Sequence, residues 1–273
     1  MIGQKNLLST ISKMIDNDKF PSFSIIVGAE GSGKKTLARE IVSMLRATHI
    51  NVENKIDDIR NFIELNNSQT SKIVYILYDM ETASLEAKNS LLKVLEEPAK
   101  NSHIILLTNS KESLLSTILS RGVIFEIEPY YEEDFKEYVK SREIKKDLTK
   151  YLKVCNNIGE LETAFDVDID KYIDTTYKMV VNMKVATLSE LLLVPNKLEL
   201  SFDKNDMSLF INSLQYNLNR VAKSQIDKDK VSIENIINVS KGLGVLRRQL
   251  NFKSMNKKYL LDEFFINMWR ELR

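Results

Sequence analysis

Short apolar runs alternate with amphipathic stretches through the first half of the chain. Apolar runs without a polar face are typical of strands that are buried on both sides of a parallel sheet. Four such runs stand at 22–27, 72–78, 103–107 and 123–127. Helical spacing of apolar residues fills the intervals, at 6–15, 34–47, 55–65, 84–97 and 111–119. The pattern predicts an α/β domain with a mostly parallel sheet and flanking helices.

From Pro129 onward the pattern is helical. The stretch 130–166 predicts two or three short helices with a turn at 156–159, and from residue 168 only helical spacing remains. Its clearest segments are 188–194, 207–221, 231–250 and 259–269, with breaks at Pro195 and at 227–229. The second half therefore has a different architecture from the first.

Length and charge narrow the class of protein. A chain of 273 residues with 43% hydrophobic residues is long enough for two or three domains with ordinary cores. Lys and Arg number 39 against 38 Asp and Glu, so the formal charge is only +1. This balance is not that of a protein coated in basic residues for nucleic acid or membrane surfaces. Any nucleic-acid contact has to come from a local patch or from partner proteins.

The single cysteine, Cys155, excludes an internal disulfide and any zinc site built from several cysteines. Its place in an apolar-leaning helix predicts a buried, inert thiol in a reducing compartment. The first residues lack the apolar core of a signal peptide, and no run approaches the ~18 apolar residues of a membrane span. We therefore expect a cytoplasmic protein without membrane contact.

The stretch 28–36, Gly-Ala-Glu-Gly-Ser-Gly-Lys-Lys-Thr, lies between an apolar run and a helical pattern. It fits the phosphate-binding loop G-x-x-x-x-G-K-[ST] at every required position but the last. In such loops glycines let backbone N–H groups converge on phosphate oxygens, and the lysine reaches the outer phosphates. The residues that supply these parts are Gly28, Gly31, Gly33 and Lys34.

The position after Lys34 should carry a hydroxyl that binds Mg²⁺, and it carries Lys35. Thr36 comes one residue late, about 100° further round the helix, so we do not expect it to reach the metal. The sequence thus predicts a degenerate nucleotide site with a fault at the metal position, and no metal site. Binding of ATP or ADP is expected to be weak or absent.

Two further polar positions follow buried strands, where ligands bind in open parallel sheets. After 72–77 comes Tyr78-Asp79-Met80-Glu81, in a place where an ATPase carries a metal-binding Asp followed by a water-orienting Glu. If Asp79 is the metal-binding acid, Met80 replaces the Glu; if Asp79 takes the second position, Tyr78 replaces the metal-binding acid. Asp79 also suits a turn or a helix cap. Asn109 ends the next strand, as a γ-phosphate sensor or as a turn residue.

A basic run occupies the last third of the chain. It consists of Lys241, Arg247, Arg248, Lys253, Lys257 and Lys258. Such a run can approach phosphate backbones, but a solvated helix face is the favoured interpretation.

Several motifs together resemble one family. The stretch 89–98, Asn-Ser-Leu-Leu-Lys-Val-Leu-Glu-Glu-Pro, resembles the N-A-L-L-K-x-L-E-E-P helix of bacterial clamp-loader AAA+ subunits. Residues 117–122, Thr-Ile-Leu-Ser-Arg-Gly, resemble their T-I-x-S-R-C motif, and Ile-Gly-Gln at 2–4 and the loop through residue 38 stand at the family's spacing. The resemblance covers the first half of the chain. Beyond it, only the helical character matches.

The resemblance implies an AAA+ P-loop domain at 1–128, a small helical lid at 129–167 and a helical, oligomerising collar at 168–273. It implies gamma or tau and delta subunits as partners, and through them the sliding clamp and primer-template DNA. The chain would belong to the DNA polymerase III holoenzyme. Members with a four-cysteine zinc module carry it in the interval 46–71, which has no cysteine here.

Anchoring on the motif at 89–98 puts Tyr78 at the family's metal-acid position and Asp79 at its glutamate. The same alignment puts Gly159 where motor subunits carry a second sensing arginine. Loss of these groups is the pattern of the non-hydrolysing delta prime type, which requires no cofactor of its own. The family's Ser-Arg motif makes Arg121 an arginine finger for a neighbour's ATP site.

Three alternatives stay open at this stage. An active gamma- or tau-like motor would need Thr36 and Asp79 to suffice for hydrolysis. An unrelated P-loop nucleotide or phosphate transferase would need an acceptor site, for which the helical last third offers no catalytic cluster. A structural adaptor that uses only the collar would leave Arg121 without a role.

Overall fold

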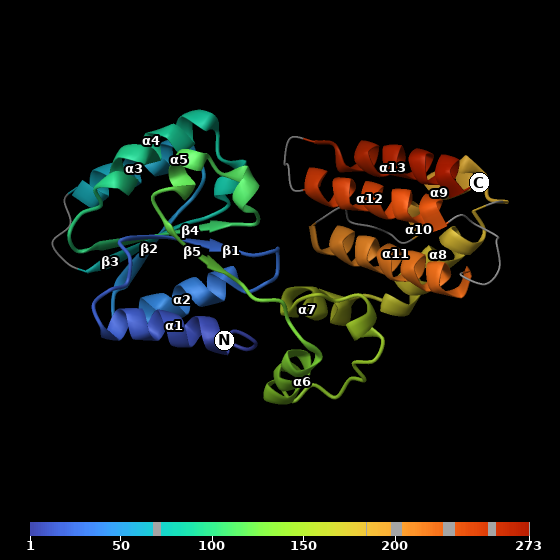
Figure 1. The fold of residues 1–273 in the computed structure, drawn as a ribbon, viewed down its shortest axis with the longest axis horizontal. Helices are drawn as coiled ribbons and strands as arrows, with labels where there is room; N and C mark the ends of the chain where they lie inside the picture. Colours follow the sequence, from blue (N-terminus) through green and yellow to red (C-terminus); the bar gives the residue numbers. More distant parts are fainter. Residues whose placement is uncertain (68–71, 184, 198–203, 226–232, 251–254, 273) are drawn as a thin grey trace. The chain divides into compact units, whose positions relative to one another are not determined.

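The computed structural model of this chain describes residues 1–67, 72–183, 185–197, 204–225, 233–250 and 255–272. It divides into two compact units, Met1–Tyr138 and Val139–Arg273 (Figure 1). The boundary falls inside helix α6 (Glu132–Ser141). The predicted division into three parts is a different one, and it stays a prediction.

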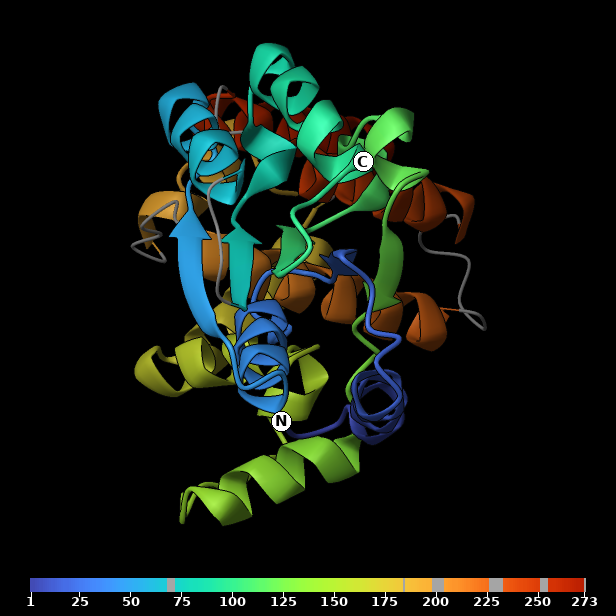
Figure 2. The same cartoon turned by 90° about the vertical axis from the view of Figure 1, so that its left-hand side faces the viewer.

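The first unit contains a sheet of five parallel strands in the order β2-β3-β4-β1-β5, which lie side by side in Figure 2. The strands are β1 (Phe23–Val27), β2 (Thr48–Val52), β3 (Ile73–Leu77), β4 (Ser102–Thr108) and β5 (Val123–Glu126). The four predicted apolar runs form β1, β3, β4 and β5, which confirms the parallel sheet. The sequence pattern missed β2, because this edge strand exposes most of its residues and carries few apolar ones.

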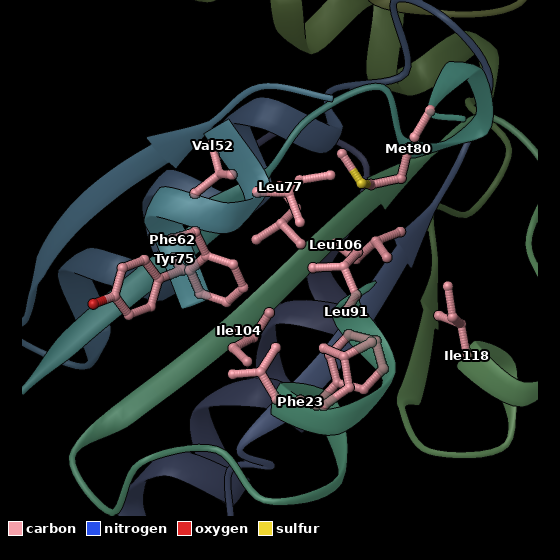
Figure 3. Close-up of a cluster of buried hydrophobic side chains, with 14 of the residues drawn as sticks. Phe23, Val52, Phe62, Tyr75, Leu77, Met80, Leu91, Ile104, Leu106 and Ile118 are labelled. Atoms are coloured by element: carbon pink, nitrogen blue, oxygen red, sulfur yellow. The ribbon is translucent and has the colours of Figure 1, made fainter. Parts of the chain in front are cut away.

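Helices cover both faces of the sheet and enclose two hydrophobic cores. On one face lie α1 (Lys5–Asp16) and α2 (Lys34–Met44), and on the other α3 (Ile56–Asn67), α4 (Leu85–Glu96) and α5 (Ser116–Leu119). Figure 3 shows the core on the second face, where Tyr75 and Leu106 of the sheet meet Phe62 of α3 and Leu91 of α4. Both faces of the central strands are thus buried, as their continuous apolar runs require.

The predicted helix at 111–119 is divided in the structure. A 3₁₀ turn, η2 (Lys111–Ser113), is followed by the extended residues Leu114 and Leu115 and then by α5. Leu114 is buried in the core, which favours an extended backbone at this point over a continuous helix. A second 3₁₀ turn, η1 (Met80–Thr82), follows β3.

The described part of the second unit is helical. Its helices after α6 are α7 (Ile158–Asp166), α8 (Ile169–Val181), α9 (Leu188–Leu192), α10 (Val194–Lys197), α11 (Lys204–Gln225), α12 (Ile233–Gln249) and α13 (Lys257–Leu272). Helix α11 is central, since it packs against α7, α8 and α12. The predicted all-helical second half is confirmed for the residues described.

Three details differ from the sequence pattern or lie beyond it. The predicted turn at 156–159 is a helix start, since the Asn157 side chain accepts from the Glu160 N–H and caps α7. Pro195 lies within α10, in its first turn, where the missing N–H costs no intrahelical bond. The predicted break at 227–229 and Lys253 fall outside the described residues. Among the helices that the structure describes, none has the length and apolar character of a membrane span.

Candidate functional site

The phosphate loop connects the end of β1 to the start of α2, as the sequence predicts. Gly31 and Gly33 have φ of 75° and 92°, a backbone conformation that side chains strongly disfavour. At Gly28 a Cβ would lie 2.5 Å from the Ser32 Oγ, so the tight loop leaves no room for one. The three glycines thus permit the turn that brings Lys34 back over the loop.

Lys34 binds the loop itself and one residue from a neighbouring strand. Its Nζ donates to the carbonyl oxygens of Gly28, at 2.6 Å, and Ala29, at 2.8 Å. It also donates to the Asn109 Oδ1 at 2.7 Å. Because β1 and β4 pair in parallel, their carboxyl ends lie together, and Asn109 just after β4 comes within reach of the loop. The structure therefore brings together the two predicted site residues Lys34 and Asn109.

Glu81 is a site residue that the sequence interpretation did not select. The Asn109 Nδ2 donates to the Glu81 Oε1 at 2.7 Å, which extends the chain of contacts from Lys34 through Asn109 to a carboxylate. The other oxygen, Oε2, is buried and has no hydrogen-bond partner. The available signal was its position just past a buried strand, but both motif registers placed the expected acids earlier.

Lys88, on α4, fixes the turn that carries Glu81. It is only 9% exposed, and its Nζ donates to the carbonyl oxygens of Glu81, at 3.2 Å, and Ser113, at 3.0 Å. Burial lowers the pKa of Lys88, and the nearby Glu81 carboxylate opposes this shift. Lys88 thereby joins η1, which holds Glu81, to η2 beyond Asn109.

The other two predicted nucleotide-site residues are placed differently. Thr36 is exposed on the first turn of α2. Asp79 starts η1 with φ of 49°, and its carbonyl oxygen accepts from the Asn54 Nδ2 at 3.3 Å and the Thr82 Oγ1 at 3.0 Å. These contacts agree with the turn role that was left open for Asp79.

Lys35 stands at the loop position whose hydroxyl binds Mg²⁺ in a P-loop ATPase, and it lies near Tyr78, which the family resemblance puts at the metal-acid position. The Lys35 Nζ lies 5.1 Å from the centre of the Tyr78 ring. The Tyr78 hydroxyl donates to the Asn51 Oδ1 at 3.0 Å, and burial raises the pKa of Tyr78, so the phenol stays neutral. Mg²⁺ prefers charged or carbonyl oxygen ligands, and an ammonium is not one. The residues present do not fit the metal.

Tyr130 covers the outer side of the loop. Its hydroxyl donates to the Ser32 carbonyl oxygen at 2.9 Å. A Cβ on Gly33 would lie 3.3 Å from this hydroxyl and 2.6 Å from the Met1 methyl group. Burial, with Asp134 nearby, raises the pKa of Tyr130 to about 12. The Lys34 ammonium and the Ser32 carbonyl oxygen thus already have hydrogen-bond partners within the chain.

Arg121 stands in the turn between α5 and β5. Its guanidinium donates to the Glu96 carboxylate at the end of α4 and to the Thr117 carbonyl oxygen. The next residue, Gly122, packs directly on β1, since a Cβ there would lie 2.8 Å from the Phe23 ring. The turn therefore has a firm base, while 28% of the Arg121 side chain stays exposed.

Strand register places Arg121 away from its own phosphate loop. Val123 pairs with Ser24 and Glu126 with Val27, so Arg121 precedes the amino end of β5. The loop starts at the opposite, carboxyl end of β1. Four strand residues, about 13 Å at 3.3 Å each, separate the amino ends of the strands from their carboxyl ends. Arg121 therefore lies at the end of the sheet opposite this polypeptide's own phosphate loop.

Comparisons with known proteins relate the chain to one family. A family model described as "DNA polymerase III, delta subunit" matches residues 44–131. DNA polymerase III subunit gamma of Buchnera aphidicola is 26% identical over 232 residues, which make up 72% of this chain and 63% of that protein. Subunit delta' of Bacillus subtilis is 29% identical over 34% of this chain and 28% of its own length. These matches support membership of the clamp-loader family of AAA+ proteins.

Among solved structures, a DNA polymerase III gamma subunit-related protein of Thermotoga maritima matches this clamp-loader chain over 97% of its residues and 99% of that chain. The identity is 19% and the TM-score 0.48. The curated clamp-loader relatives named above are matched over less than two thirds of their own length. Relatives named gamma, tau and delta' all match at low identity, so the comparisons leave the type of subunit undecided.

The clamp-loader alignment also directs attention to α7, in the second unit. Gly159, at the predicted position of a second sensing arginine, lies in the first turn of this helix. Its neighbour Glu160 is only 8% exposed and accepts from the Asn156 N–H at 2.7 Å and the Asn212 Nδ2 at 3.0 Å. This end of α7 is thus tied to α11 by a buried carboxylate.

Proposed function

We propose that this chain is a non-hydrolysing clamp-loader subunit of the delta prime type. It assembles in the cytoplasm with gamma or tau and delta subunits, and the complex loads the sliding clamp on primer-template DNA. The observation that carries the proposal is the place of Arg121, on a turn packed against β1 at the end of the sheet opposite its own phosphate loop. The ammonium of Lys35 over Tyr78, where a motor subunit would hold Mg²⁺, supports it.

In this proposal Arg121 serves the ATP site of a neighbouring gamma or tau subunit. A guanidinium on the transferring phosphate stabilises charge that develops in the transition state, and such fingers contribute about 10³–10⁵ in rate where they have been measured. Glu96 holds Arg121 before assembly. Their contact is an exposed ion pair of small net stability, so a phosphate can displace Glu96 at little cost.

The test is Arg121→Ala in the complete clamp loader, assembled with gamma or tau and delta. We expect DNA-stimulated ATP hydrolysis and clamp loading to fall, because one neighbouring site loses its transition-state charge, while size exclusion shows normal assembly. Lys100→Ala, which removes another exposed cation, is the control and should leave both activities unchanged. Unchanged activity of the Arg121→Ala complex would contradict the role of Arg121 as an arginine finger.

One observation favours a second candidate, an active motor subunit. Lys34, Asn109 and Glu81 form a continuous chain of contacts, and a carboxylate beside a sensing asparagine is a suitable group to orient a water. Steady ATP hydrolysis by the isolated chain with Mg²⁺, abolished by Lys34→Ala, would support this candidate. We expect no turnover by the isolated chain.

A further inference from the structure

We propose that Lys35 and Tyr78 together form a built-in block that takes the place of the divalent cation and keeps metal-bound nucleotide out of the phosphate loop. This inference rests on the proposed non-hydrolysing function and names the residues responsible for it. It also assigns the two side chains a joint role: Lys35 places a positive charge at the metal position and Tyr78 supplies no carboxylate, so both must change before a metal is held.

The geometry is the first step. Lys35 is the second residue of α2, directly after the loop lysine, and Tyr78 directly follows β3. These are the positions whose hydroxyl and carboxylate hold Mg²⁺ in P-loop ATPases. The Lys35 Nζ lies 5.1 Å from the Tyr78 ring centre, so the fold still brings the two positions together. The backbone for a metal site is retained, and its ligands are replaced.

Charge is the second step. An ammonium at the metal position repels a divalent cation, and the π-face of the phenol holds the ammonium there. The Tyr78 hydroxyl is committed to Asn51 and the side chain is only 8% exposed, so no anionic oxygen is offered to a metal. Arg39 adds a second positive charge within electrostatic reach of Tyr78, and Glu53 a negative one.

The rest of the loop is the third step. Gly31 and Gly33 keep the loop geometry, and Lys34 contacts Asn109, which contacts Glu81. Within the loop and the adjoining strand ends, the groups that cannot hold a metal are thus Lys35 and Tyr78. Restoring a hydroxyl and a carboxylate at positions 35 and 78 should therefore restore metal-dependent nucleotide binding without further changes.

The experiment uses the full chain and four proteins: the wild type, Lys35→Thr, Tyr78→Asp and the double variant. Bound Mn²⁺ is measured by electron paramagnetic resonance with ATP present, and binding of a fluorescent ATP analogue is measured with Mg²⁺ or with EDTA. We expect the double variant to retain Mn²⁺. It should bind the analogue at least about tenfold more tightly with Mg²⁺ than with EDTA, a gain of about 1.4 kcal/mol or more in binding free energy. The wild type and both single variants should retain no Mn²⁺.

The matched control is the double variant Lys35→Met with Tyr78→Phe, which removes the cation and the hydroxyl but supplies no metal ligand. It should gain no Mn²⁺ binding. Circular dichroism and assembly with the partner subunits check that each variant folds. Retention of Mn²⁺ with ATP by the wild type would overturn the block, and this result does not depend on any variant. A folded double variant without Mn²⁺ binding would overturn the role of the pair.

These outcomes separate the block from the proposed function. If the double variant fails to bind metal while Arg121→Ala still lowers hydrolysis in the complex, the block alone is wrong. If the wild-type chain binds Mg·ATP and turns it over, both are wrong. If the metal-binding results agree with the block and Arg121→Ala changes no activity, only the role of Arg121 as an arginine finger is wrong.

Discussion

At the scale of single residues, surroundings change what a side chain can do. Lys34 and Lys35 are neighbours of the same type, yet one binds backbone carbonyls and Asn109 while the other lies over an aromatic ring. Arg247, which the sequence placed in an exposed basic run, donates through its Nη2 to the Asn212 Oδ1 at 2.6 Å. Residue type sets the available chemistry, and the neighbours decide which part of it is used.

Cys155 gives a prediction at this scale. It is 6% exposed, and burial, with Glu160 nearby, raises the pKa of its thiol to about 12. The thiolate is the reactive form, so we expect the native chain to react with Ellman's reagent at pH 8 at least about a hundredfold more slowly than the urea-unfolded chain. Rapid reaction of the native chain would contradict the burial described here.

The raised pKa of Cys155 also makes the stability of the folded chain depend on pH. The folded pKa lies above the unfolded one, so the unfolded chain loses this proton first as the pH rises. The contribution of Cys155 to the free energy of unfolding is therefore fully present below about pH 9, and it declines as the pH rises from there towards 12. Cys155→Ala should make the alkaline decline shallower in urea unfolding measured at several pH values.

At the scale of elements, local pattern predicted the central strands and most helices, and it failed where an element depends on its neighbours. Strand β2 is polar and exposed, and its pairing with β3 holds it in the sheet. The predicted helix at 111–119 breaks because Leu114 enters the core. In both cases tertiary contacts outweigh the local pattern.

Helix α7 provides the prediction for this scale. Glu160 accepts hydrogen bonds from the Asn156 N–H, the Asn212 side chain and the Ser208 hydroxyl, which tie α7 to α11. Glu160→Gln replaces an acceptor by a donor against these partners, so we expect a loss of about 1–3 kcal/mol in the free energy of unfolding of the second unit.

The measurement is urea unfolding followed by the fluorescence of Trp269, the only tryptophan of the chain. Trp269 reports on this unit because its Nε1 donates to the Ala186 carbonyl oxygen at 3.0 Å. Asp166→Asn, at an exposed position of the same helix, is the matched control and should shift the unfolding free energy by less than about 0.5 kcal/mol. Equal effects of the two variants would argue against the buried link.

At the scale of the whole molecule, the chain forms two compact units of different architecture. The first unit holds the phosphate loop and Arg121 at opposite edges of one sheet, and the second is a helical body. In the proposed complex the first unit would face a neighbour's ATP site, so activity would be a property of the assembly.

Whole-molecule charge leads to a prediction on DNA. The formal charge is +1, and the basic run does not act as one free patch, since Arg247 is directed to Asn212. Affinity for DNA backbones comes from phosphate neutralisation, so we expect the isolated chain to bind primed DNA no more tightly than about 10⁻⁴ M at 150 mM salt. Fluorescence anisotropy measures this. Micromolar binding that is lost in Lys241→Ala with Arg248→Ala would show a DNA surface in the basic run.

The sequence by itself determined the strand–loop–helix unit around Lys34, the parallel sheet and the helical second half, because apolar runs, glycine spacing and helical periodicity are local properties. Only the tertiary structure decided that Glu81 joins Asn109, that Lys35 meets Tyr78 and that Arg121 lies opposite its own loop. Each of these depends on strand order and register, which bring together residues far apart in the chain. No periodicity in the sequence records such a pairing.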